Sequence, residues 1–202
     1  MQLTGLQQAP EVAADAMGAR VTSHTVSADG MQTTYAVDLI DLATAKVQRI
    51  ESSTGTLFGP AISATTISWF SPGDFADNKR EIRLWVRSGD RITRYTEPLW
   101  PQSALALADQ RVGPIVRPGD SDWCLRIFDG TSVRTVKLTG RNTGVAGVGN
   151  RFVAAVGGPL RTAGVYSIDR TAKRIATVGA EKALIASALL SAGQLWTADG
   201  SR

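Results

Sequence analysis

Hydrophobic and polar residues alternate in short runs along this chain, and one such run recurs four times. Its copies are residues 47–50, 92–95, 133–136 and 175–178. Their first residues lie 45, 41 and 42 positions apart (92−47, 133−92, 175−133). Alternation with a period of two predicts strands, and recurrence at about 42 residues predicts a fold built from repeated units.

A second landmark precedes each copy of this motif, an apolar residue that is followed by a polar turn. The landmarks are Ile40-Asp41, Val86-Arg87, Phe128-Asp129 and Ile168-Asp169. The connections between landmark and motif are rich in Gly, Asp, Ser and Thr, which are typical of turns between antiparallel strands. The pattern therefore predicts a hairpin in each unit, and the motif forms the second strand of that hairpin.

Two further strands are predicted upstream of each hairpin. The first is rich in small residues, which suits a strand close to a common axis where bulky side chains would clash. Its copies are residues 59–63, 103–108, 144–148 and 183–188. The second strand ends in a glycine turn, at residues 71–74, 117–120, 156–158 and 198–200. Strong helix formers also allow a helix over residues 183–190, but the position within the repeat favours a strand.

The best example of the unit is residues 165–178, Val-Tyr-Ser-Ile-Asp-Arg-Thr-Ala-Lys-Arg-Ile-Ala-Thr-Val. This segment resembles the blades of bacterial β-propeller repeat proteins, a broad family that includes the YVTN type. The resemblance covers the chain from Tyr35 onward. The family's repeated Ser-Pro-Asp-Gly turn is absent, although Ser71-Pro72-Gly73-Asp74 comes close.

These patterns predict an all-β fold, a small β-propeller with four blades of four antiparallel strands. Residues 33–52 would supply an outer pair of strands and residues 183–199 an inner pair, whose pairing would close the ring and remove open edges. Residues 1–32 would then be an N-terminal lead or docking segment, and residues 33–202 the propeller. Residues 20–27 also alternate, so this blade could hold a surplus strand that swaps into a neighbour. Two copies could alternatively form one eight-bladed homo-oligomeric ring.

Few residues are available for catalysis or metal binding. The chain has one cysteine, Cys124, and one histidine, His24, so Ser-His-Asp and Cys-His mechanisms and zinc sites lack parts. The loop carboxylates Asp74 and Asp120 lack the twelve-residue calcium pattern. We therefore expect no catalytic residue, no metal, no cofactor and no enzymatic activity.

The formal net charge of +4 comes mainly from arginines, some of which recur in the outer strand of the unit. A nucleic-acid surface would need aromatic residues interleaved with these charges, so a solvated surface or a protein interface is favoured. Trp100 lies between two prolines and is expected to be an exposed interface anchor. The predicted interface residues are Trp100, Arg49, Arg94, Arg134, Arg83 and Arg87.

The leading functional expectation is a non-catalytic structural or protein-binding subunit of a larger assembly, with other protein subunits as partners. Small propellers of this kind resemble accessory domains of bacteriophage tails, which implies a virion component. One alternative is a carbohydrate or small-ligand binder that uses the central opening and the loops around Trp69, Phe75 and Trp100. A propeller hydrolase ranks last because the inner strands lack carboxylates. Residues 1–18 lack the features of a signal peptide, and no apolar run reaches the roughly 20 residues of a membrane span. We therefore expect cytoplasmic synthesis and no membrane partner.

Overall fold

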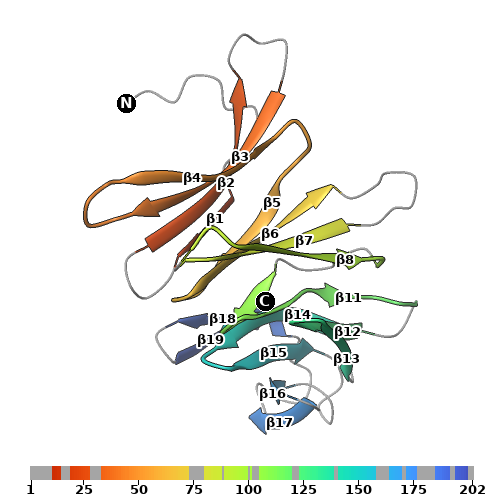
Figure 1. Ribbon diagram of the computed structural model, residues 1–202. Helices are drawn as coiled ribbons and strands as arrows, with labels where there is room; N and C mark the ends of the chain where they lie inside the picture. Colours follow the sequence, from red (N-terminus) through yellow and green to blue (C-terminus); the bar gives the residue numbers. More distant parts are fainter. Residues whose placement is uncertain are drawn as a thin grey trace. The chain divides into compact units, whose positions relative to one another are not determined.

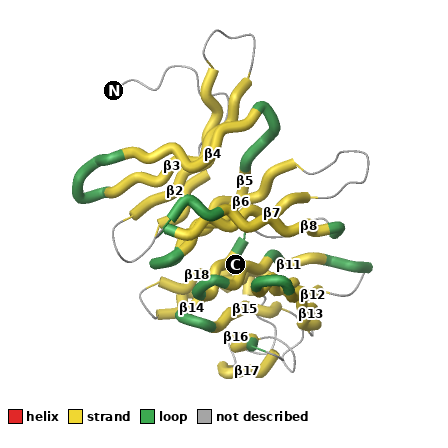
Figure 2. The backbone as a smooth tube through the Cα atoms, viewed as in Figure 1, coloured by secondary structure: helices red, strands yellow, loops and turns green. Residues whose placement is uncertain are grey.

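Antiparallel pairing between strands that are close in the sequence organises the whole chain (Figure 1). The computed structural model describes residues 11–14, 19–27, 33–72, 80–87, 89–99, 101, 105–119, 123–138, 141–157, 164–169, 172–176, 185–191 and 194–199. These residues form strands, turns and loops, with no helix among them (Figure 2). The chain divides into two compact units, Met1–Trp100 and Pro101–Arg202.

The first unit contains two sheets of four strands each, in which spatial order follows chain order. Sheet A consists of β1 (Glu11–Ala14), β2 (Ala19–Ser27), β3 (Thr33–Asp41) and β4 (Val47–Ser53). Sheet B consists of β5 (Phe58–Ile62), β6 (Thr66–Pro72), β7 (Arg80–Val86) and β8 (Ile92–Glu97). The two sheets pack through a cluster that contains the buried side chains of Val37, Leu57, Ile67, Trp69 and Trp85.

A β-bulge in sheet A directs two neighbouring side chains of β4 toward sheet B. Val37 lies opposite Glu51 and Asp38 opposite Arg49, so Ile50 is the extra residue in the ladder. A bulge changes the direction in which side chains leave a strand. As a result, Ile50 packs against the cluster between the sheets, and the neighbouring Glu51 reaches Arg83 on β7.

The second unit contains sheets of five, four and two strands. Sheet C consists of β9 (Ala106–Ala108), β10 (Arg111–Gly113), β11 (Ile115–Val116), β12 (Trp123–Asp129) and β13 (Ser132–Leu138). Sheet D consists of β14 (Arg141–Val148), β15 (Arg151–Gly157), β16 (Gly164–Ile168) and β17 (Ala172–Ala176). Sheet E consists of β18 (Ile185–Ser191) and β19 (Gln194–Asp199).

Strands β10 and β11 pair with β12 in one continuous register and are separated by Pro114. Val112 lies opposite Phe128 and Ile115 opposite Leu125, while the carbonyl oxygen of Pro114 accepts a hydrogen bond from the N–H of Arg126 at 3.1 Å. Proline has no N–H to donate to a ladder. The two strands therefore take the place that a single second strand takes in sheets A, B and D.

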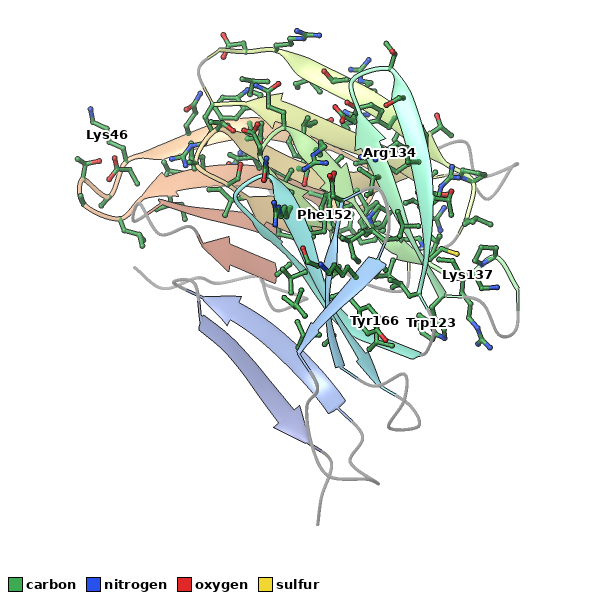
Figure 3. All side chains as sticks on the ribbon, turned by 90° about the horizontal axis from the view of Figure 1, so that it is seen from below. Lys46, Trp123, Arg134, Lys137, Phe152 and Tyr166 are labelled. Carbon is green, nitrogen blue, oxygen red and sulfur yellow. The ribbon has the colours of Figure 1, made fainter. Side chains whose placement is uncertain are left out.

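Sheets C and D are held together by an extensive apolar cluster. Leu125, Ile127 and Val136 contribute from sheet C, and Phe152 and Ile168 contribute from sheet D. The half-buried Trp123 packs against the edge of this cluster near Tyr166 (Figure 3). Alternate residues of each strand supply these contacts, as the period-two pattern predicts.

The inner strands β9 and β14 approach each other so closely that only glycine fits at one position. A Cβ atom on Gly147 would lie 1.4 Å from the carbonyl oxygen of Leu107. This contact gives a physical reason for the small residues that recur in the predicted inner strands, since a larger side chain here would force two backbones apart.

The structure confirms the all-β class, the hairpin in each repeat and the strand over residues 185–191, where the helical alternative was wrong. The predicted closure and strand count were wrong. Strand β3 pairs with β2 along its whole length and not with the C-terminal pair, which forms the separate sheet E. Residues 11–14 and 19–27 of the expected lead are thus strands of sheet A. A short hairpin connection costs less chain entropy than closure across the whole chain.

We expect Gly147→Ala to lower the free energy of unfolding by roughly 1–3 kcal/mol, the usual cost of overpacking a closely packed site. Urea unfolding followed by tryptophan fluorescence measures this change. Gly119→Ala in the same unit is the matched control, because its added Cβ would meet no atom within 4 Å. Equal effects of the two substitutions would contradict the close approach of β9 and β14.

Candidate functional site

The recurring motif occupies the outermost strand of four sheets, as predicted. Strands β4, β8 and β17 lie at the ends of sheets A, B and D, and β13 pairs only with β12 in sheet C. The motif copy at residues 175–178 is described as far as Ala176. The four outermost strands therefore present equivalent positions of the repeat at a sheet edge.

The first residue of the motif is a large apolar side chain that is exposed in three of its four copies. Val47 is 62% exposed, Val133 46% and Ile175 58%. In the fourth copy, Ile92 packs against the cluster between sheets A and B. Leu42, in the turn that precedes β4, is also about half exposed. These residues were not among the predicted interface residues, although their recurrence was the signal that could have identified them.

Arg49 lies on β4 next to the exposed Val47 and forms an ion pair with Asp38. Its Nε donates to Asp38 Oδ1 at 2.5 Å and its Nη2 donates to Asp38 Oδ2 at 3.2 Å. This hydrogen bonding raises the pKa of Arg49. Because the arginine side chain is half exposed, the pair contributes little to stability, and Arg49 remains accessible at the edge of sheet A.

Arg94 and Arg134 also lie on outermost strands. Arg94 is exposed on β8, and Arg134 is half-buried on β13. Neither forms an ion pair with a residue that the structure describes. Figure 3 labels Arg134 and Lys137 on β13, and Lys46 in the turn before β4.

Arg83 lies inside the first unit, where it joins sheets A and B. Its Nη1 donates to Glu51 Oε1 of sheet A, and its Nη2 donates to Glu81 Oε2 on its own strand at 2.9 Å. The side chains of Arg83 and Glu51 are only 19% and 12% exposed. Burial lowers the pKa of Arg83, and the positive charge of Arg94 across the ladder adds to this effect. Arg83 therefore forms an internal contact of the first unit.

Arg87 has a local role at the turn between β5 and β6. Its backbone N–H donates to the carbonyl oxygen of Thr65 at 2.7 Å, and its Nη1 donates to the carbonyl oxygen of Ser63 at 3.2 Å. Trp100 and Phe75 lie outside the described residues. Trp69 is fully buried between sheets A and B, so its own side chain is a packing residue of the first unit.

The described residues offer little for metal chemistry or for a reactive thiol. No group of three or more His, Cys, Asp or Glu side chains in this part of the chain could hold a metal ion. Cys124 is buried in sheet C. No helix that could span a bilayer occurs in the segments that the structure describes.

Solved structures with similar folds were found, whereas no protein-family model and no curated protein matches the sequence. The β-propeller domain of the trilobed protease from Pyrococcus furiosus, which has an open velcro topology, is similar with a TM-score of 0.63 and 9% identity over 90% of this chain and 60% of that chain. The uncharacterized protein lmo1340 from Listeria monocytogenes EGD-e has a TM-score of 0.58 and 11% identity over 98% and 63% of the two chains. Acylaminoacyl peptidase from Pyrococcus horikoshii has a TM-score of 0.58 and 9% identity over 94% and 42%.

These similarities show that the chain has a β-propeller fold. At 9–11% identity they show the fold alone, since one fold carries many unrelated functions. The chain spans about 60% of the length of the protease propeller that it matches. The function therefore has to be inferred from the surface of this chain.

We expect Arg83→Met to lower the free energy of unfolding by about 3 kcal/mol, because it leaves the carboxylate of Glu51 buried without a cation. The double variant Arg83→Met with Glu51→Leu should regain most of this loss, since neither charge then remains. Urea unfolding of wild type, both single variants and the double variant measures the coupling energy.

Arg94→Met is the control for the Arg83 variants, because Arg94 lies directly opposite Arg83 on β8 but is exposed. It should change the free energy of unfolding by less than about 0.5 kcal/mol. Strictly additive losses in the double-mutant cycle would show that the Glu51–Arg83 pair does not couple sheets A and B.

Proposed function

We propose that this protein is a non-catalytic β-propeller that binds another protein through the outermost strands of its sheets. The observation that carries the proposal is the recurrence of an exposed Val or Ile at the first position of the motif. A single exposed apolar residue is normal on a protein surface. The repetition of an exposed Val or Ile at the same position in three of the four sheets that carry the motif needs a reason.

Strand propensity alone does not account for these residues. Threonine also favours strands, and it would avoid the exposure of an apolar side chain to water. Val47, Val133 and Ile175 instead each expose a large apolar surface at a sheet edge. Apolar surface rimmed by polar residues marks a protein interaction site where it forms a patch, and the neighbouring arginines suit such a site because arginine is enriched at interfaces.

A role within a larger assembly is consistent with the names of the similar structures, one of which is the propeller domain of a protease. In the trilobed protease the propeller is one domain of a larger protein. The finer proposal, a structural subunit of a bacteriophage tail, is supported only by the resemblance of small propellers to tail accessory domains.

The test compares the wild-type chain with a variant that carries Val47→Ser, Val133→Ser and Ile175→Ser. Each tagged protein is used to capture proteins from cells of its native source, and the captured proteins are quantified by mass spectrometry. We expect the variant to capture at least about tenfold less of the partner than the wild type does. The reason is that each apolar side chain that becomes buried in the interface contributes about 1.5–3 kcal/mol to binding.

A matched control variant replaces exposed polar residues of the outermost strands, Gln48→Ser on β4 and Thr96→Ser on β8. It should capture the partner as the wild type does. Circular dichroism and urea unfolding check that all three proteins are folded. Equal capture by the wild type and the apolar variant would overturn the proposal.

A further inference from the structure

The edges of the outermost strands combine three features that define the chemistry of a partner. We propose that they bind an extended acidic segment of another protein, which adds to a sheet edge as an antiparallel strand. This inference rests on the proposed protein-binding function and deepens it by naming the kind of partner and its orientation.

The first feature is an available strand edge. Strands β4, β8 and β13 each pair with one strand among the described residues and lie at an edge of that pairing. A strand directs the N–H and C=O groups of alternate residues away from its partner, and an edge strand is thus a template for an added strand. Strand β13 is well suited, since Ser132, Val133, Thr135 and Lys137 are all exposed along it.

The second feature is the sign of the charge at these edges. The exposed charged side chains on the four outermost strands are all cationic: Arg49, Arg94, Lys137 and Lys173. The two acidic residues on the same strands are turned inward. Glu51 accepts from Arg83 between the sheets, and the buried Glu97 accepts a hydrogen bond from the N–H of Leu99 at 2.9 Å. An approaching segment therefore meets positive charge, which favours an acidic partner.

The third feature is the order of groups along β4 and β13; in β17 the order is reversed, since the exposed Lys173 comes before Ile175. In β13 the exposed Val133 comes first and the cationic Arg134 and Lys137 follow, and in β4 Val47 comes before Arg49. Asp41 and Asp129 lie at the turns before β4 and β13, and the exposed Lys46 lies in the first of these turns. An antiparallel partner would place acidic residues in its N-terminal half and apolar residues in its C-terminal half.

The same edges are poorly suited to single-stranded nucleic acid. Such ligands are bound by aromatic side chains on which the bases stack. Tyr95 is the one aromatic residue in the described outermost strands, and it is half-buried. Exposed Val and Ile side chains instead match the apolar side chains of an added strand, which pack beside them on the same face.

The experiment measures the binding of fluorescein-labelled peptides to the full chain by fluorescence polarisation. The probe is the acetylated amide Glu-Thr-Glu-Thr-Val-Thr-Val, and the comparison peptides are its reversed sequence and a version with lysine in place of glutamate. We expect the probe to bind at least about tenfold more tightly than either comparison peptide. A probe methylated on alternate backbone nitrogens should lose binding, because it cannot complete the strand ladder.

Two charge variants of the protein show where the probe binds. Replacing Arg94, Arg134 and Lys137 by Gln should weaken binding by about tenfold, since each exposed charge pair contributes up to about 1 kcal/mol. Replacing Lys46, Arg117 and Arg151 by Gln removes three exposed cations that lie off the outermost strands. This control variant should bind the probe as the wild type does.

Several results would overturn the inference. Equal or tighter binding of the reversed peptide would refute the orientation, and binding of the methylated probe would refute strand addition. Tighter binding of an oligothymidine than of the probe would indicate a nucleic-acid surface. If no peptide binds while the apolar triple variant still loses its captured partner, the inference fails and the proposed function stands. If that variant also keeps its partner, both fail.

Discussion

Packing of one sheet against the next is the interaction on which this structure depends. A single four-stranded sheet has two faces, and it buries its apolar side chains only when another sheet covers them. In the first unit Trp69 and Trp85 of sheet B meet Val37 of sheet A. In the second unit Ile127 of sheet C meets Phe152 of sheet D. The stacking buries the faces of the sheets, so the outermost strands are where the fold presents edges to solvent.

The two inter-sheet clusters differ in their polar content. Sheets C and D meet mainly through apolar side chains and share an ion pair whose carboxylate is exposed, Arg111 with Asp169 at 3.4 Å, whereas the ion pair between Arg83 and Glu51 of sheets A and B is largely buried. A bulge at Ile50 makes this pair possible, because it turns Glu51 toward sheet B. Such a pair pays a desolvation penalty and adds geometric definition to the contact. Neighbouring arginines on paired strands thus have different roles, since Arg94 on β8 is exposed opposite Arg83 on β7.

Much of the fold could be predicted from the alternation and the period of the motif, because a strand and its hairpin depend on neighbours in the chain. The strand at residues 133–136, its turn at Asp129 and its edge position all followed from local pattern. Strand β1 was missed and β2 was anticipated only as a surplus strand of its blade, because their segments lack the two landmarks of the repeat. The exposure of Val47 was not predicted, since an apolar residue in an alternating strand usually faces a core.

The sequence by itself determined the elements of this protein, their order and the repeat that links them, because these follow from side-chain period and turn chemistry. Tertiary structure decided which strands completed each sheet and which side chains were covered. Gly147 illustrates the difference: its small size was visible in the sequence, but the reason is the carbonyl group of Leu107 on another strand. Contacts between distant segments depend on the packing of whole sheets, and no local pattern contains that information.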